Sequence, residues 1–518
     1  MMRKIGLAAG FILALTTCAT NPVTGKKELS FVGEQWELDI GKQQYSPSRQ
    51  SQGGDYLADP HIQAYINKVG QRVAAVSDRQ LPYEFKVINS SVPNAWALPG
   101  GKIAINRGLL TELKSESELA AVLGHEVVHA AAKHGAKGFT RGALLQGGLL
   151  AATVATAGKE YSNIAQVGAS VGAQLISTRY GRDAERESDK FGIEYMVRAG
   201  YDPLGAVDLQ RTFLELSKDR RSDFLTGLFA SHPPSAERLA NNQQLVATLK
   251  AEGRADGETG RDRYQENMAR LTRSIPAYEA YEEAKKAFAE KNVAGARRLV
   301  QQAIRIEPNE GHFHSMLGDM ELAANNPRAA VGHYDSAIKA NNGFFYYHLQ
   351  KGLASEALRD YRAASASLNR SVELLPTANA HNALGNIAKL SGRRDDAVAQ
   401  FSKAAGHDSP AGAAAMESLL DLDLPTNPGK YIATRPQVSE RGDVSILVQN
   451  KTPKNLDRVV LRVVYPVSET NQRELTHQVR GILAAGKTTE VSLSLRINPA
   501  LARGLGSGVV RAAISSRQ

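Results

Sequence analysis

A 34-residue period between residues 277 and 410 constrains the fold of this 518-residue chain more than any other feature. Three columns of the period contain small or apolar residues, spaced 34 apart with one later step of 33: Ala296, Ala330, Ala364 and Ala397; Gly318, Gly352 and Gly385; Tyr334, Leu368 and Phe401. Because independent columns share one period and one deletion, the segment is predicted to repeat a single structural unit. The small residues indicate that two helices cross closely within each unit.

The repeated unit resembles tetratricopeptide repeats. Pro308 and Pro376 lie 68 residues apart, which is twice the period, and each closes a unit. The resemblance implies an all-α solenoid over residues 277–410, with a concave face that grips peptides or protein partners. The alternative interpretation is an ordinary helical bundle.

Other patterns flank this segment. Residues 61–250 are predicted to form an α+β domain, and residues 432–518 a small β-sandwich of five or six strands. In the first of these, helical spacing covers 61–76, 115–134 and 161–199, and strand-like alternation covers 83–88 and 102–106. In the second, alternation covers 444–449, 458–465, 474–480, 488–496 and 508–515. Residues 18–60 are expected to form a turn-rich N-terminal arm.

The first 17 residues resemble a bacterial lipoprotein signal peptide. A short basic start precedes the 11-residue apolar run Ile5–Leu15, and Cys18 follows closely. Eleven apolar residues are too few to cross a bilayer, which needs about 20. The resemblance implies lipidation at Cys18 and, because Ala19 follows, anchoring to the inner leaflet of the outer membrane. The alternative is an ordinary cleaved signal and a soluble periplasmic protein. Ala143–Ala157 is also too short to span a membrane and is expected to pack as a small-residue helix.

Composition excludes several classes of protein. Apolar content of 42% and charged content of 22% are those of a globular chain. Cys18 is the single cysteine, so neither an intramolecular disulfide nor a cysteine-based zinc site can form. The net charge of +10 is spread without a dense Lys/Arg tract, which argues against nucleic-acid binding.

Residues 125–129 match the pattern H-E-x-x-H within a predicted helix. His125 and His129, at positions i and i+4, lie on one helical face and can share one metal ion. Glu126 is then placed to take a proton from water at the open side of the ion. A buried helix with two satisfied histidines is the alternative, but burying three such side chains beside an apolar face without a metal is costly.

A zinc site of this kind needs a third protein ligand. The metzincin pattern is excluded, because Ala132 and Gly135 stand where it requires Gly and His. The gluzincin pattern places a Glu on a later helix and an Asp four residues on, and Glu185 and Asp189 fit it. Glu185 is therefore predicted to bind the metal and Asp189 to orient a ligating histidine. Glu187 is predicted to be a surface residue; a solvated charged helix face is the alternative for Glu185.

Four motifs in order make the chain resemble peptidase family M48, which includes the heat-shock membrane protease HtpX and the CAAX prenyl protease. They are the segment 94–101, the segment 118–129 with the H-E-x-x-H pattern, Arg182 with Glu185 and Asp189, and His232-Pro233-Pro234 with Arg238. The resemblance covers roughly residues 20–250. Gly181 and Ser188 depart from the family pattern by small-for-small changes.

The resemblance implies one Zn²⁺ per chain, held by His125, His129 and Glu185, with Glu126 as general base. It also marks His232 as a fourth ligand that keeps water out until it moves, after which it could stabilise the oxyanion. Arg182 and Arg238 are expected to form supporting ion pairs. His134 is expected to be structural.

The resemblance further implies that the segment around Asn94, Ala95 and Trp96 is a strand edge that aligns an extended substrate. The expected fold is thus multidomain: a gluzincin-type α+β metallopeptidase domain, a tetratricopeptide solenoid and a β-sandwich. The expected function is zinc-dependent proteolysis of unfolded or misassembled envelope polypeptides, with the outer-membrane assembly machinery as a partner of the repeats. The alternative is a chaperone-like scaffold whose metal site is gated or vestigial.

Overall fold

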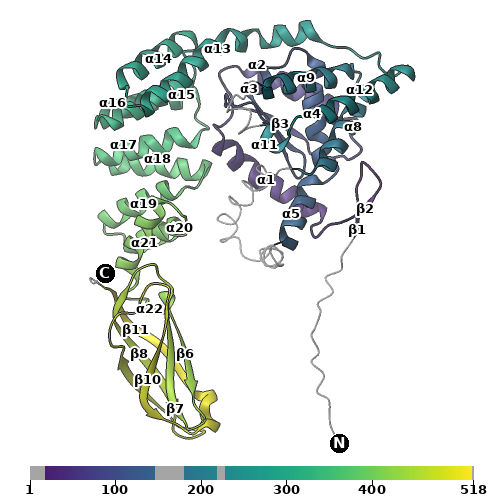
Figure 1. Cartoon of the computed structure of the whole chain (residues 1–518). Coiled ribbons are helices and arrows are strands. Elements are labelled where there is room, and N and C mark those ends of the chain that lie inside the picture. The colour runs from purple at the N-terminus through teal and green to yellow at the C-terminus, as the bar shows by residue number, and fades with distance from the viewer. Residues whose placement is uncertain (1–17, 146–179, 219–227, 516–518) are drawn as a thin grey trace, which may run out of the picture. The chain divides into compact units, whose positions relative to one another are not determined.

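A computed structural model describes residues 18–145, 180–218 and 228–515 of the chain (Figure 1). The chain divides into two compact units, residues 1–351 and 352–518. The expected signal segment 1–17 and most of the apolar stretch 143–157 lie outside the described residues. No helix within the described ranges is long and apolar enough to cross a membrane.

The first unit contains a three-stranded sheet beside a bundle of helices. The sheet has the order β3-β5-β4, with β3 parallel and β4 antiparallel to β5. Its strands are β3 (Glu84–Ile88), β4 (Ala95–Leu98) and β5 (Lys102–Asn106). The helices are α2 (Pro60–Ala74), α3 (Arg107–Leu110), α4 (Glu116–Ala131), α5 (His134–Leu145), α8 (Arg182–Arg198), α9 (Leu204–Lys218), α11 (Leu228–Ser231) and α12 (Ala236–Ala251). This mixed architecture confirms the predicted α+β class.

Helix α4 lies at the centre of this bundle, and all of its residues are buried (Figure 1). Ser115 caps it by accepting from the Glu118 N–H, while the Glu118 carboxylate accepts from the Lys114 N–H. This arrangement satisfies backbone donors that burial would leave unpaired. The helix ends earlier than the predicted residue 134, because Lys133 adopts a left-handed conformation with φ of 61° before α5 begins.

Helices α4 and α8 cross at two glycines. A Cβ atom on Gly124 would lie 3.1 Å from the Gly192 carbonyl oxygen, and one on Gly192 would lie 3.1 Å from the His125 nitrogen. The crossing therefore brings the backbones of the two helices as close as glycine allows. The predicted helix over 161–199 is not continuous, because Tyr180 and the extended Gly181 are not helical and α8 begins at Arg182. Residues 161–179 of that prediction lie outside the described residues.

We expect Gly192→Leu to lower the free energy of unfolding by about 2 kcal/mol or more, because the side chain has no space between the helices. Thermal unfolding measures the loss. Gly181→Ala is the matched control, since a Cβ there meets no atom within 4 Å. An unchanged midpoint for Gly192→Leu would show that the helices can separate at little cost.

The N-terminal arm has more regular structure than predicted. Strands β1 (Cys18–Thr20) and β2 (Lys27–Leu29) form a hairpin, and Glu34–Ser51 forms helix α1. The turn signals are correct: Asn21-Pro22 lies in the turn of the hairpin, and residues 52–55 follow the end of helix α1. The low amphipathicity of α1 explains why its sequence does not reveal it, since Gly41 and Pro47 interrupt the pattern.

The repeat segment forms successive antiparallel helices, which confirms the predicted all-α solenoid architecture. The first unit contains α13 (Arg261–Ala289), α14 (Val293–Ile306), α15 (Gly311–Ala323) and α16 (Pro327–Ala340); α17 (Phe345–Ala357) spans the boundary between units; α18 (Tyr361–Leu374), α19 (Ala378–Leu390), α20 (Arg394–Ala404) and α21 (Pro410–Asp423) follow. The glycine column meets the aromatic and leucine column at each helix crossing. A Cβ on Gly318 would lie 2.6 Å from Tyr334, and one on Gly385 would lie 2.5 Å from Phe401.

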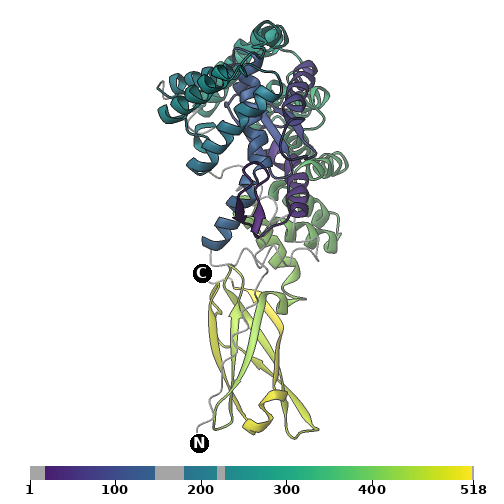
Figure 2. The ribbon, with the colours of Figure 1, turned by 90° about the vertical axis from the view of Figure 1, so that its right-hand side faces the viewer.

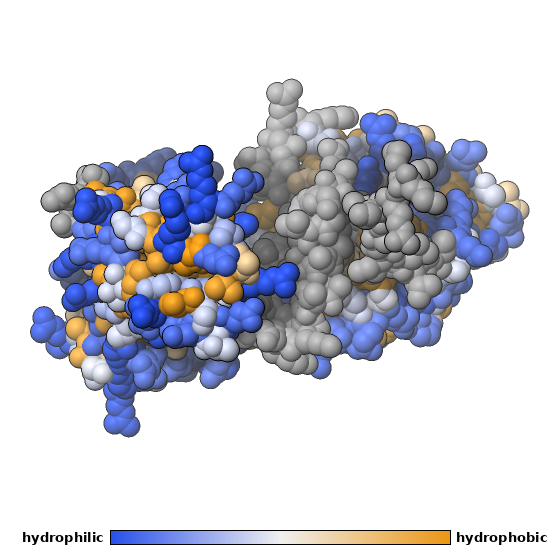
Figure 3. All heavy atoms as spheres, turned by 90° about the horizontal axis from the view of Figure 1, so that it is seen from below, coloured by the Kyte–Doolittle hydropathy of each residue, from blue (hydrophilic) through white to orange (hydrophobic). Residues whose placement is uncertain are grey.

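The second unit ends in a sandwich of two three-stranded antiparallel sheets, as predicted (Figure 2). A four-residue helix, α22 (Pro428–Tyr431), leads into it, and the short 3₁₀ helix η2 (Pro499–Gly504) precedes its last strand. The strands are β6 (Ile432–Val438), β7 (Asp443–Asn450), β8 (Leu456–Pro466), β9 (Gln472–Gln478), β10 (Thr488–Arg496) and β11 (Gly506–Ile514). Alternate apolar residues of both sheets share one core. Figure 3 shows apolar side chains gathered among hydrophilic ones on the end of the sandwich that faces the viewer.

Candidate metal centre

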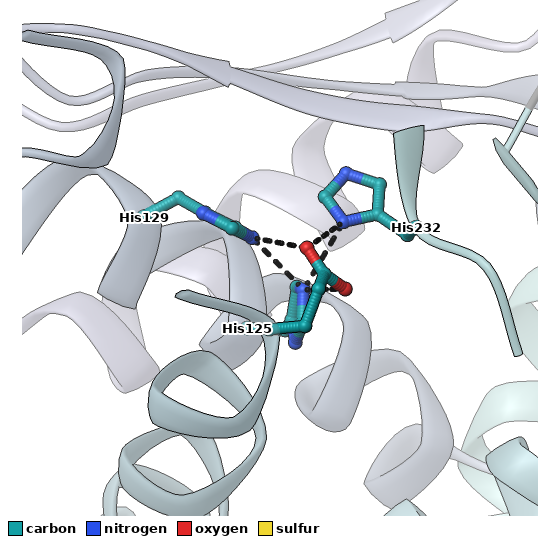
Figure 4. A group of neighbouring side chains, drawn as sticks. His125, His129 and His232 are labelled. Carbon is teal, nitrogen blue, oxygen red and sulfur yellow. Dashed lines mark hydrogen bonds and ion pairs between the residues drawn. The ribbon is translucent and has the colours of Figure 1, made fainter. Parts of the chain in front are cut away.

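Four side chains from three elements converge in the first unit (Figure 4). Helix α4 supplies His125 and His129, α8 supplies Glu185, and the bend after α11 supplies His232. All four are buried, and one ligand atom from each lies within 4.8 Å of the others. The H-E-x-x-H spacing places the two α4 imidazoles on one face, and the glycine crossing brings α8 to that face.

The Glu185 carboxylate stands between the three imidazoles. Its Oε1 lies 3.5 Å from His129 Nε2 and 3.0 Å from His232 Nδ1, and its Oε2 lies 3.6 Å from His125 Nε2. The two α4 Nε2 atoms are 3.0 Å apart. Among the described residues this is the one cluster of at least three His, Cys, Asp or Glu side chains with metal-ligand spacing.

The Nδ1 atom of His125, on the side of the ring away from the cluster, already has a hydrogen-bond partner. It lies 3.0 Å from Asp189 Oδ1, and both Asp189 oxygens accept hydrogen bonds of 2.6 Å from Arg238. Nδ1 therefore carries the proton, and Nε2 presents a lone pair to the cluster. The donor set fits a divalent metal such as zinc, which takes imidazole nitrogen and carboxylate oxygen in a four-coordinate site.

Electrostatics shift the ionisation of the cluster strongly. Burial opposes charge on His125, but Glu185 and Asp189 outweigh it and raise the pKa of His125 to about 10. Burial lowers the pKa of His129 well below its usual value. Burial also disfavours the Glu185 anion, yet His232 and His125 hold the pKa of Glu185 well below its usual value. In the absence of a metal, Glu185 is therefore an anion held by the positive charge of His125, a charge that a bound cation can replace.

Glu126 lies beside the cluster without joining it. Its Oε1 is 3.6 Å from His232 Nε2, and its buried Oε2 has no hydrogen-bond partner among the described residues. Burial raises the pKa of Glu126. A carboxylate with a raised pKa and an unpaired oxygen next to a metal centre has the properties of a general base.

The structure distinguishes the two arginines that the family pattern marks. Arg238 donates to Asp189 and lies 3.0 Å from Glu185 Oε2, so it supports the site as predicted. Arg182 is exposed in the first turn of α8 and forms no ion pair with any of the described residues. The expected ion pair of Arg182 is thus not found among the described residues, where its exposed side chain lines a pocket together with Glu185 and Arg238.

One further expectation differs from the structure. Glu187, expected at the surface, is half-buried, and its Oε1 contacts His134 Nε2 and Asn21 Nδ2. His134, expected to be structural, lies outside the ligand cluster and places its Nδ1 2.9 Å from His129 Nδ1. The break of α4 at Lys133 turns His134 back toward His129, which a continuous helix would not do. No sequence signal singles out Tyr180, whose ring stacks on His129 at 3.9 Å.

The predicted substrate edge forms strand β4. Trp96 is buried, and its indole N–H donates to Gln52 Oε1. In the sheet, β4 pairs with β5 on one side and is the last strand on the other. An edge strand can accept an extended peptide by backbone pairing.

A small cavity of about 40 Å³ adjoins His125, Glu126 and His232. Its remaining walls are mostly apolar and come from α4, α8 and α9, including Val122, Ile193, Met196, Leu209 and Phe213. An apolar side chain next to a reacting bond can be buried there.

The part of the chain that contains this site is similar to known proteins. Residues 60–246 match the model of Peptidase family M48. The chain is 26% identical over 405 residues to the β-barrel assembly-enhancing protease of Escherichia coli K12, covering 67% of this chain and 80% of the relative. It is 29% identical over 245 residues to the mitochondrial metalloendopeptidase OMA1 of Schizosaccharomyces pombe. This match covers 46% of this chain and 70% of the relative.

Among solved structures, the chain is similar to helical-repeat proteins. A thermophilic TPR protein from Thermus thermophilus shares 23% identity with a TM-score of 0.25, over 34% of this chain and 96% of that chain. YrrB, described as a TPR protein with an unusual peptide-binding site, is 17% identical with a TM-score of 0.25. The match covers 40% of this chain and 96% of YrrB.

Proposed function

Because residues 60–246 form a peptidase domain of family M48, we propose that the chain is a zinc-dependent endopeptidase of the Gram-negative cell envelope that degrades misfolded or misassembled outer-membrane and periplasmic proteins. One observation carries the proposal: the side chains of His125, His129 and Glu185 converge beside the unpaired Oε2 atom of Glu126. Three metal ligands next to a buried carboxylate are the groups that metal-assisted hydrolysis requires, whereas a purely structural helix bundle does not need them.

Zinc held by His125, His129 and Glu185 would supply Lewis-acid activation of water and of the scissile carbonyl. Glu126 accepts the proton of the attacking water, because its Oε2 is unpaired beside the cluster and burial raises its pKa, which makes the carboxylate a stronger base. The same carboxyl group then passes the proton to the leaving amine. Asp189 and Arg238 keep His125 in the required tautomer.

His232 is proposed to gate the site. Its Nδ1 lies 3.0 Å from Glu185 Oε1 and 3.3 Å from His125 Nε2, which makes it a fourth donor to the same point. Four protein ligands close a zinc site, whereas catalysis needs one position open. His232 must therefore leave the fourth position before substrate is hydrolysed. Its Nε2 already lies 3.6 Å from Glu126 Oε1, and a donor that stays on this side of the site can stabilise an oxyanion.

We expect His232→Ala to raise basal cleavage of an unfolded polypeptide several-fold, because the fourth position opens permanently. Initial rates with a fluorescently labelled unfolded protein measure the effect. Ser231→Ala, which removes only a hydroxyl bonded to the Leu228 carbonyl, is the control. Equal or lower activity in His232→Ala would instead assign His232 a catalytic or structural role.

The envelope location and substrate class rest on three features. Cys18 follows a signal-like segment, which supports a lipid anchor at the outer membrane. Relatives that match two-thirds of the chain are β-barrel assembly-enhancing proteases. The helical repeats offer a surface of the kind that binds polypeptides, and we propose that it receives substrates or the outer-membrane assembly machinery.

Complementation in cells that lack the native protease tests the proposal. The wild-type chain should clear a slowly assembling outer-membrane protein, whereas Glu126→Gln should not. A form without the repeats should retain zinc but lose that substrate. Full complementation by Glu126→Gln would favour a scaffold over a protease.

A further inference from the structure

A hydrogen-bonded network connects the N-terminal hairpin to His129. His129 Nδ1 lies 2.9 Å from His134 Nδ1, and His134 Nε2 lies 3.3 Å from Glu187 Oε1. The same Glu187 oxygen accepts a hydrogen bond of 2.8 Å from Asn21 Nδ2. We call these four residues the His129 network; they come from α4, α5, α8 and the hairpin of β1 and β2.

The geometry allows one assignment of protons when His129 faces a cation. His129 Nε2 points into the ligand cluster, so its proton is on Nδ1 and is donated to His134 Nδ1. His134 must then carry its own proton on Nε2, which donates to Glu187. The bonds from His129 to His134 and from His134 to Glu187 therefore run outward from the metal centre, and the Asn21 amide donates to the same carboxylate from the hairpin side.

Burial makes this direction hard to reverse. His129, His134 and Asn21 are all buried, so bulk water does not compete for their nitrogens. Tyr180 covers the other face of His129. A histidine that lost its acceptor here would leave a buried N–H unpaired or would turn away from the cluster.

Asn21 is itself rigid. Its Oδ1 accepts hydrogen bonds from the backbone N–H groups of Val23 and Thr24, and its own backbone N–H donates to the Lys26 carbonyl. The turn of the hairpin thus fixes the side chain with its Nδ2 aimed at Glu187. Glu28 also pairs with Lys137 on α5, so the hairpin is docked at two places.

We propose that His134, Glu187 and Asn21 are positioning residues of the metal centre, and that the docked hairpin 18–29 sets how tightly His129 holds the metal. The inference rests on the proposed function, because it requires that His129 bind zinc. It assigns to His129 the support that His125 receives from Asp189 and Arg238. Asn21 lies three residues after Cys18, so attachment of the chain at Cys18 would restrain the same hairpin.

Zinc affinity of the full-length chain tests the proposal, measured by competition with a chromophoric chelator. His134→Phe keeps a ring beside His129 but removes both nitrogens, and we expect it to weaken zinc binding about 10- to 100-fold. Asn21→Asp keeps the Oδ1 acceptor of the turn but places a second carboxylate against Glu187, and a smaller loss is expected. If His134→Phe does not fold, Glu187→Gln replaces it as the test variant, because Glu187 is only half-buried and its substitution disturbs the core less.

Thr140→Val is the matched control. Thr140 is buried on α5, and its hydroxyl accepts from the Phe31 N–H of the same N-terminal arm, but it does not belong to the His129 network. We expect its zinc affinity to stay within about twofold of wild type, because the ligands and their supports are untouched. Thermal unfolding of the zinc-free proteins is measured in parallel. We expect Asn21→Asp and Thr140→Val to have similar unfolding midpoints, so that a difference in their zinc affinity does not come from a difference in stability. The absorption spectrum of the cobalt-loaded proteins reports the geometry of the metal ligands. We expect this spectrum to change in His134→Phe, with or without a change in Asn21→Asp, and to stay that of wild type in Thr140→Val.

Unchanged zinc affinity in both His134→Phe and Asn21→Asp would overturn the network. So would an equal loss in Thr140→Val, because the effect would then come from general loosening of the arm. If the wild-type chain binds no zinc, the proposed function itself fails, and this result is distinct from a wild type that binds zinc as tightly as its variants.

Discussion

Glu126→Gln is expected to reduce cleavage of an unfolded polypeptide by about 10²- to 10⁴-fold, the typical contribution of general acid–base catalysis. The amide has the shape of the carboxylate but cannot take a proton from water at neutral pH. Glu126 lies outside the four-residue ligand cluster, so zinc content should remain that of wild type. Initial rates and elemental analysis on the same preparation separate the two effects.

Glu237→Gln is a suitable control for that experiment. Glu237 lies on α12 near the site, but its side chain is half exposed and pairs with the surface residue Arg186. Its loss should leave the rate unchanged. Undiminished cleavage by Glu126→Gln would refute the assignment of the general base and, with it, the proposed mechanism.

Glu185→Ala is expected to remove most of the bound zinc, leaving well below one equivalent per chain. The substitution deletes one of three ligands, and it also leaves Arg238 without one of its two buried carboxylate partners. The loss of zinc affinity should therefore be larger than the loss expected from deleting one metal ligand whose removal left no other side chain unpaired. Elemental analysis after dialysis against a weak chelator measures it.

Asp183→Ala provides the comparison on the same helix. Asp183 lies two residues before Glu185 in the first turn of α8, and its side chain is 99% exposed in a surface pair with Arg186. We expect this variant to keep its zinc. Full retention of zinc by Glu185→Ala would mean that His232 completes the site instead, and the gluzincin assignment would be wrong.

The local sequence is sufficient for features that depend on periodicity. The 34-residue period predicts the repeated helices, because Gly318, Gly352 and Gly385 must be small wherever two helices cross. Alternating patterns predict the strands of the sheet and the sandwich. The pair of histidines one helical turn apart predicts a shared metal site, since helix geometry alone places them on one face.

Long-range placement explains what the sequence could not show. Whether a charged residue of α8 faces the metal or the solvent depends on how α8 crosses α4, and that angle follows from the contact of Gly124 with Gly192. For this reason the sequence does not show that Arg182 is exposed in the first turn of α8. The expectation that Glu187 lies at the surface is wrong for the same reason.

The sequence by itself determined the classes of the three structural regions and the ligand types of the candidate site, because both follow from residue spacing within single elements. Tertiary structure alone decided which atoms of the outer groups meet, and it added His134, Glu187 and Asn21, which no motif marks. Arg238 meets Asp189 across 49 residues, and Asn21 meets Glu187 across 166. Such contacts arise when separate elements pack into one core, and no spacing along the chain encodes them.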